Sequence, residues 1–219
     1  MVMKLALFVK WLAHAGFLIK TGSKVIYIDL EEHCEAKEKA DLILVTHSHY
    51  DHCDPAKIEK VRKQDTVVIA PKDCVSKISG AVKSLAAGEE VTIGEVRVKA
   101  VEAYNNKRFR SPGNPFHPKG FGVGYLVTAE GKTVYHAGDT DFIPEMRNLK
   151  GIDVALLPTG DTYTMGSVDA VEAVLAINPK VAVPMHTWGK DMSEFKKRVE
   201  AGSKTKVVVL REGEEFQVP

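Results

Sequence analysis

The stretch from His47 to His52 packs four side chains that can ligate a metal ion into six residues. The apolar run 42–45 before it predicts a short buried strand, which delivers the cluster onto the following loop. In extended backbone, residues i and i+2 point the same way, so His47 and His49 can reach one ion while Asp51 and His52 face a neighbouring position. The cluster predicts a metal site at the end of this strand, with its other ligands supplied by other strand ends.

A helix is expected directly after this loop. Pro55 suits the first turn of a helix because its ring fixes φ near the helical value, and residues 56–62 continue the helix. Such a helix start holds the histidine loop rigid. The alternative is that the histidines cluster by chance or cap the helix. It is disfavoured because histidine is scarce and buried polar groups need partners.

Strands in this sequence come singly or in hairpins, and helices separate only some of them. This arrangement predicts an α/β (α+β) fold of two mixed β-sheets with outer helices, formed by one domain over residues 1–219. Strands are expected at 4–11, 16–21 and 25–29 as an antiparallel meander, and at 42–45, 66–70, 123–128, 133–137, 153–157, 181–184, 206–210 and 215–218, with two more between 88 and 103. Helices are expected at 56–62, from 71, at 142–149, from Ser167 as its cap to Asn178, and from Asp191 to 200.

The segment 104–124 is the longest stretch without periodicity and carries several glycines and prolines. A loop of this length inside a compact domain is uncommon unless it is functional. It contains His117 and four basic residues, which either hold a phosphate or carboxylate of a substrate or, as in the more frequent case, are solvated. The four are Lys107, Arg108, Arg110 and Lys119.

Further metal-competent side chains lie in this loop and after other predicted strands, namely His117, Asp139 and His186. Nitrogen and oxygen donors without thiolates favour a borderline divalent ion, zinc first and manganese, iron, cobalt or nickel after it. A structural zinc site closes at four ligands, so the larger set predicts two divalent ions about 3.5–4 Å apart, with Asp139 as the candidate bridge. Such ions ionise a water near neutral pH, and Asp51 can accept or shuttle a proton.

Composition excludes several classes of protein. The formal net charge is +1 with both signs interspersed, so a nucleic-acid-binding surface is not expected. No apolar run approaches the roughly 18 residues of a membrane span, and the N-terminal one is too short for a signal peptide. The three cysteines, Cys34, Cys53 and Cys74, form no Cys-x-x-Cys pair, which fits a reducing compartment. We therefore expect a cytoplasmic protein without a membrane partner, and the sequence leaves homo-oligomer formation open.

Three motifs occur in order along the chain: His47-Ser-His49-Tyr-Asp51-His52, Gly138-Asp139-Thr140 and Met185-His186. They resemble the metallo-β-lactamase superfamily, whose fold is a four-layer αβ/βα sandwich, and the resemblance covers nearly the whole chain. Within the superfamily the chain is similar to a branch of small metal-dependent hydrolases related to the ascorbate 6-phosphate lactonases. The motifs of this closer resemblance are Trp11-Leu-Ala-His14-Ala-Gly16, Tyr135-His136-Ala-Gly-Asp139-Thr140 and Thr162-Tyr163-Thr164-Met165-Gly166.

The resemblance implies two metal ions with a carboxylate between them. His14 and His136 either orient ligands or contact substrate, and for His136 a structural place inside the sheet is an equal alternative. With Asp51 and Asp139, His14 is a predicted catalytic residue. The implied ligands are His47 and His49 for the first ion, Asp51, His52 and His186 for the second, and Asp139 as the bridge.

The sequence departs from the family pattern at the first ion. The family's third histidine usually follows the strand that ends before the long loop, where this chain has Tyr104-Asn105. His117, Asn105 or water completes the site instead, with His117 favoured. Asn105, Tyr163 and Trp188 are expected to contact substrate, and packing under a loop is an equal alternative for the two aromatic residues.

These expectations predict a metal-dependent hydrolase that uses a metal-activated hydroxide on a small anionic ester, lactone or phosphodiester. One alternative is a nuclease or phospholipid phosphodiesterase of the same superfamily. It is disfavoured because the chain has no large basic appendage to bind RNA and no apolar segment to bind a membrane. A second is a non-catalytic metal-binding or redox-sensing scaffold, against which the near-complete ligand set argues. The fold alone does not set the substrate, because specificity lies in the loops.

Overall fold

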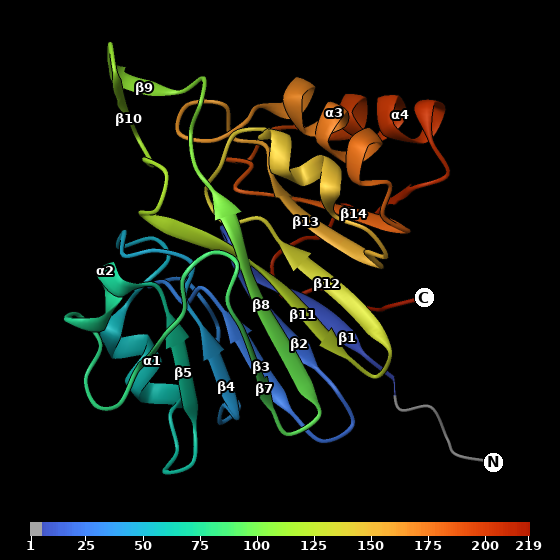
Figure 1. Ribbon diagram of the computed structural model, residues 1–219. Coiled ribbons are helices and arrows are strands. Elements are labelled where there is room, and N and C mark those ends of the chain that lie inside the picture. Colours follow the sequence, from blue (N-terminus) through green and yellow to red (C-terminus); the bar gives the residue numbers. More distant parts are fainter. Residues whose placement is uncertain (1–5) are drawn as a thin grey trace.

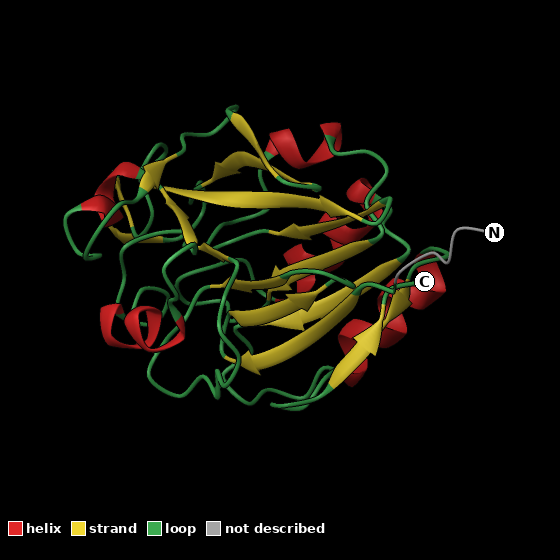
Figure 2. Ribbon diagram, turned by 90° about the horizontal axis from the view of Figure 1, so that it is seen from below, coloured by secondary structure: helices red, strands yellow, loops and turns green. Residues whose placement is uncertain are grey.

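Two seven-stranded mixed sheets face each other in the computed structural model, which describes residues 6–219 (Figure 1). Helices lie outside the sheets in both views, so the molecule has the predicted four-layer sandwich (Figure 2). Helices α1 and α2 cover the first sheet, and η1, α3 and α4 cover the second. The helices are α1 (Pro55–Val61), α2 (Lys72–Val75), the 3-10 helix η1 (Pro144–Asn148), α3 (Ser167–Ile177) and α4 (Ser193–Gly202).

The first sheet joins the expected antiparallel meander, β1 to β3, to three parallel strands. The expected start of the first strand at residue 4 lies outside the described residues. Strand β1 runs on to Ala13, which leaves only a tight turn for His14. In sheet order the strands are β16 (Glu215–Gln217), β1 (Phe8–Ala13), β2 (Gly16–Lys20), β3 (Val25–Ile28), β4 (Leu42–Leu44), β5 (Val67–Ala70) and β6 (Lys83–Ser84).

The second sheet combines three parallel strands, β13 to β15, with the antiparallel hairpins of the middle of the chain. Strand β12 pairs parallel with β13 and antiparallel with β11. In sheet order the strands are β15 (Lys206–Val207), β14 (Val181–Met185), β13 (Val154–Pro158), β12 (Lys132–His136), β11 (Gly122–Ala129), β8 (Val96–Ala103) and β7 (Glu90–Ile93).

Strand β4 shows why the central strands read as unbroken apolar runs. Leu42 and Leu44 pack into the core between the sheets, whereas Ile43 packs into the outer core beneath α1 and α2. Both faces of the strand are therefore covered, and no position favours a polar residue. Strand β8 lies near the sheet edge and alternates instead, with Val96 and Val98 buried and the residues between them exposed.

Some expected elements differ in the structure. The segment 104–124 is not a plain loop, because it folds into an antiparallel hairpin of β9 (Phe109–Ser111) and β10 (Asn114–Pro115) that projects from the sandwich (Figure 1). Ser167 is the first residue of α3 rather than its cap; Gly166 holds the cap position without a side-chain hydrogen bond. Within residues 6–219, none of the helices combines the length and apolar character needed to cross a membrane.

Candidate metal centre

The candidate ligands gather where parallel strands of both sheets end. Strands β3 and β4 are parallel in the first sheet, and residues 47–52 follow β4. Strands β12 to β14 are parallel in the second sheet, and Asp139 follows β12 while His186 follows β14. The backbone N–H of His186 donates to the carbonyl of His14 at 3.1 Å, which joins the two halves at this point.

Three histidine rings point at one another in the first cluster. Nε2 of His47 lies 3.1 Å from Nδ1 of His49, which lies 3.2 Å from Nε2 of His117. The structure therefore places His117, from the long loop, with the two histidines of the motif. These three side chains can each offer one nitrogen to a common ion.

Asn105 lies behind His117 and fixes its ring. Its Oδ1 accepts hydrogen bonds from the backbone N–H of His117 at 2.7 Å and from Nδ1 at 2.9 Å, while its Nδ2 donates to the carbonyl of Tyr163 at 3.0 Å. An amide oxygen only accepts, so the proton of His117 sits on Nδ1 and the lone pair of Nε2 faces the cluster. Asn105 was expected to contact substrate; its buried amide is engaged with the protein and is not among the residues that line the pocket.

The second cluster contains His14 in addition to the ligands that the sequence implied. Nε2 of His14 lies 3.3 Å from Oδ2 of Asp51. His14 adopts φ 46° in the tight β1–β2 turn, which brings its ring centroid to 3.9 Å from that of His186. Ligand atoms of His14, Asp51, His52 and His186 all lie within 4.8 Å of one another.

Asp139 lies between the two clusters. Its Oδ1 is 3.2 Å from Nε2 of His52, and its Oδ2 is 3.3 Å from Nε2 of His186 and 3.4 Å from Nε2 of His117. Gly138 before it has φ 65°, and a Cβ there would lie 2.8 Å from the carbonyl oxygen of Val123. Glycine therefore permits the turn that directs Asp139 into the centre.

Asp29, which the sequence did not single out, supports both clusters. Its Oδ1 accepts from the backbone N–H of Thr46, and its Oδ2 accepts from Oγ1 of Thr46 and from Nδ1 of His52, each at 2.7 Å. Because the Thr46 hydroxyl gives its proton to Asp29, its oxygen can accept from Nδ1 of His47, 3.0 Å away. One carboxylate thus leaves Nε2 of both histidines free to face the centre. The sequence did offer a signal for Asp29, because it is a single acid directly after the apolar strand β3, which pairs with β4.

Burial and charge set the protonation of these groups. Burial, the largest effect, lowers the pKa of His117 to about 4 and holds the pKa of His47 well below its ordinary value. Burial also lowers the pKa of His52, but the carboxylates of Asp139 and Asp29 outweigh it and raise this pKa well above its ordinary value. For Asp139 burial raises the pKa, but His186 and His52 outweigh burial and hold the pKa well below its ordinary value. The first cluster is therefore neutral, and the charged groups gather around Asp139.

Unpartnered polar atoms show that these residues fit metal ions. Among the described residues, Nε2 of His14, Nε2 of His52 and Oδ1 of Asp139 are buried without a hydrogen-bond partner. When His52 is neutral, with its proton on the Nδ1 that donates to Asp29, the lone pair of Nε2 faces the Asp139 carboxylate at 3.2 Å. Two acceptors at this distance repel each other unless a proton or a metal cation joins them. The imidazole and carboxylate donors are those that zinc and related divalent ions bind.

Comparison with known proteins assigns the chain to a family. The profile described as "Beta-lactamase superfamily domain" matches residues 8–186. The chain is 35% identical to a UPF0173 metal-dependent hydrolase of Pelotomaculum thermopropionicum and 39% identical to one of Thermococcus kodakarensis; each match covers 96% of this chain and 99% of the relative. The chain belongs to the metallo-β-lactamase superfamily.

Solved structures of similar proteins agree with this assignment. A Parabacteroides distasonis protein assigned as a metal-dependent hydrolase superposes with a TM-score of 0.87 at 34% identity, covering 95% of this chain and 94% of its own. Igni18, a metallo hydrolase of Ignicoccus hospitalis, gives a TM-score of 0.79 at 26% identity over 97% of this chain and 98% of its own. This superfamily member is a metal-dependent hydrolase.

A cavity of about 390 Å³ opens onto both clusters of the hydrolase. Tyr163 and Trp188 line it with 42% and 54% of their surfaces exposed, and their contact with substrate stays a prediction. Tyr50 and Phe116 were not expected there, although each directly neighbours a candidate ligand in sequence, which is a usable signal. The lining residues are His49, Tyr50, Asp51, Arg110, Phe116, His117, Asp139, Tyr163, His186 and Trp188.

His136 lies inside the sandwich and contacts backbone groups, which is the structural alternative given for it above. Its Nε2 donates to the carbonyl of Ala15 at 2.8 Å, and its Nδ1 accepts from the backbone N–H of Gly138 at 3.1 Å. Both nitrogens of this fully buried ring are therefore satisfied inside the sandwich. His136 ties the β1–β2 turn of His14 to the loop of Asp139 without facing the pocket.

Proposed function

We propose that this hydrolase holds two divalent metal ions and cleaves a small anionic ester, lactone or phosphodiester with a hydroxide nucleophile. The placement of Asp139 carries the proposal, because its carboxylate lies within 3.4 Å of His117 in the first cluster and of His52 and His186 in the second. A carboxylate that faces the ligands of both clusters can bridge two ions. The proposed ligands are His47, His49 and His117 for the first ion, Asp51, His52 and His186 for the second, and Asp139 for both.

Zinc is the first candidate ion, followed by manganese, iron, cobalt and nickel, since all donors are nitrogen or oxygen atoms. When bound, the ions ionise a water and polarise the oxygen of the substrate that becomes charged during the reaction. Hydrolysis forms a bond from the water oxygen to carbon or phosphorus and breaks the bond to the leaving oxygen, which then takes up a proton. Asp51 lines the pocket beside His14, so this pair can hold that proton and pass it to the leaving oxygen.

The size of the cavity supports a small substrate. Its volume of about 390 Å³ lies near the lower end of the roughly 300–1,000 Å³ of ligand pockets. Such a pocket suits a small molecule better than the RNA or phospholipid of the alternative activities. A cytoplasmic location remains a prediction.

The proposal is tested by metal analysis and a hydrolysis screen. Protein stripped with a chelator and reloaded with zinc or manganese should contain two ions per chain by elemental analysis and regain hydrolysis of lactones, phosphodiesters or carboxylate esters. His49→Ala should lose the first ion, and Asp139→Asn should weaken both, because Asp139 is shared. His33→Ala is the matched control, since His33 is exposed and lies outside the clusters. Activity that survives complete metal removal contradicts the proposal.

A further inference from the structure

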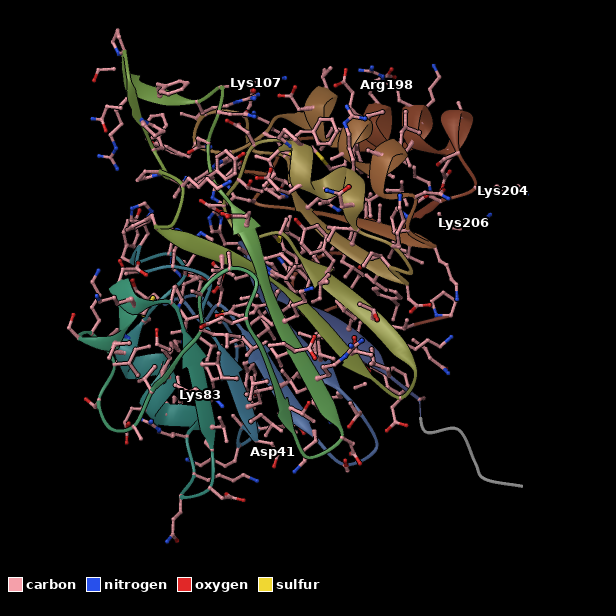
Figure 3. The ribbon with its side chains drawn as sticks, in the orientation of Figure 1. Asp41, Lys83, Lys107, Arg198, Lys204 and Lys206 are labelled. Carbon is pink, nitrogen blue, oxygen red and sulfur yellow. The ribbon has the colours of Figure 1, made fainter. Side chains whose placement is uncertain are left out.

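The four basic residues of the long loop have different surroundings. The segment 104–121, which carries the β9–β10 hairpin, is called the arm below. Lys107 lies at the base of the arm and reaches Asp169 of α3 at 2.8 Å (Figure 3). Lys119 reaches Glu145 at 2.8 Å. These two cations are therefore paired with acids of the protein and are directed away from the metal clusters.

Arg108 holds the base of the arm against the rest of the protein through three carboxylates. Its guanidinium bonds Oδ1 of Asp141 at 3.2 Å, Oδ1 of Asp161 at 2.6 Å and Oδ2 of Asp169 at 2.5 Å. Oδ2 of the buried Asp141 also accepts three successive backbone N–H groups, those of residues 106 to 108. These contacts fix the base of the arm, and with it the direction of β9, which begins at the next residue.

Arg110 differs from the other three. It lines the cavity that opens onto both metal clusters, together with His49 and Asp139. Its guanidinium lies 5.3 Å from the ring centroid of Phe116, another lining residue, so the aromatic face holds the cation at the wall. Within residues 6–219 its side chain makes no hydrogen bond or ion pair with the protein, unlike the side chains of Lys107, Arg108 and Lys119.

A neighbouring cavity carries the opposite charge. This second cavity of about 520 Å³ shares Tyr50, Asp51 and Trp188 with the first, and three glutamates but no lysine or arginine line it. An anionic group is repelled from this second cavity and attracted to the wall of Arg110. The three are Glu31, Glu32 and Glu212.

We propose that Arg110 determines specificity by binding an oxyanion of the substrate, a carboxylate or phosphate remote from the bond that is cleaved. The planar guanidinium can donate two parallel hydrogen bonds to either group, which a lysine cannot reproduce. Phe116, Tyr163 and Trp188 enclose the apolar part of the same substrate between this anchor and the metal centre. This inference rests on the proposed hydrolysis, because the cleaved bond has to lie at the metal centre. It adds that Arg110 binds the end of the substrate remote from that bond.

A matched pair of esters tests the proposal. The zinc-loaded wild type should prefer 4-nitrophenyl hydrogen succinate, an anion, over neutral 4-nitrophenyl pentanoate of similar length. Arg110→Gln should lower kcat/KM for the succinate ester about 10- to 100-fold, mainly through KM, and change the pentanoate ester less than about twofold. Arg110→Lys should restore part of the loss. Lys119→Gln, which removes a cation of the same loop that is paired outside the cavity, should change neither ester.

Direct binding separates this proposal from the hydrolysis itself. Benzoate, phenyl phosphate and neutral benzamide are titrated calorimetrically into zinc-loaded wild type and Arg110→Gln. Weaker binding of either anion to the variant, with benzamide unaffected, supports the anchor even if neither ester is cleaved, and the preferred anion distinguishes carboxylate from phosphate. Equal anion binding by the two proteins overturns the anchor, and so does an equal loss of kcat/KM for both esters. Hydrolysis that continues after complete metal removal rejects only the proposed function.

Discussion

Asp29→Asn should weaken both metal sites by reversing the tautomers of two histidines. In the structure Oδ2 of Asp29 accepts from Oγ1 of Thr46 and from Nδ1 of His52, both at 2.7 Å. An amide nitrogen at that position only donates, so His52 has to accept at Nδ1 and carry its proton on Nε2, the atom that faces Asp139. The Thr46 hydroxyl then turns its proton to Nδ1 of His47, 3.0 Å away, with the same result. The flipped amide is no better, because its nitrogen faces the backbone N–H of Thr46.

The size of the effect follows from these contacts. Losing the partner behind a metal-ligating histidine costs about 10- to 100-fold in metal affinity. Each proposed site contains one of the two affected histidines, so we expect the zinc affinity of each site to fall about 10- to 100-fold. The variant also replaces a buried carboxylate by a neutral amide. Each of the three bonds to residue 29 then falls from the roughly 1.5–3 kcal/mol of a charged group to the roughly 0.5–1.5 kcal/mol of a neutral one, which lowers the free energy of unfolding of the metal-free protein by about 3–4 kcal/mol.

Asp153→Asn is the matched control. Asp153 is also a buried acid beside a strand, and its Oδ2 accepts from the backbone N–H of Thr133 at 2.7 Å, but it lies at the start of β13, the end opposite the metal centre. This variant should lose stability and keep its zinc affinity. Zinc affinity is measured by competition with a chromophoric chelator, stability by urea unfolding, and the tautomers by nitrogen-15 shifts of the imidazole rings. Unchanged ring shifts together with a zinc affinity within about twofold of the wild type refute the reasoning.

Three further predictions each address a single feature of the centre. Asn105→Ala removes the acceptor behind His117 and should lower zinc affinity at the first cluster about 10- to 100-fold in the same competition assay, whereas Asn105→Asp keeps an acceptor and should keep most of it. Gly138→Ala should lower the free energy of unfolding in urea by about 1–3 kcal/mol, because φ 65° and the carbonyl of Val123 oppose a Cβ. Burial lowers the pKa of His117 from 6.5 to about 4, so between these pH values the unfolded chain binds more protons and stability falls as pH falls. Metal-free wild type should lose about 3 kcal/mol over this range relative to His117→Gln; parallel pH curves for the two proteins contradict the shift.

Local patterns were sufficient to predict most of the sandwich. The apolar run before His47 predicted β4, the end of the following loop at Pro55 predicted α1, and the N-terminal meander was confirmed. The two-residue strands β6 and β10 were not predicted, because so short a segment carries no periodicity of its own. The pairing of β16 with β1 was not predicted either, since it joins the two ends of the chain and depends on the closed sandwich.

By itself the sequence determined the superfamily, the fold and the kinds of atoms at the metal centre, because the motif from His47 to His52 and the strand periodicity are local properties. The tertiary structure alone decided which distant side chains share that centre. His117 lies 68 residues from His49 in the chain, and only the folded arm, with Asn105 behind the ring, turns its Nε2 toward the cluster. Only the fold could show that Arg110 faces the cavity while its neighbouring cations pair with acids, because partners far apart in sequence leave no local pattern.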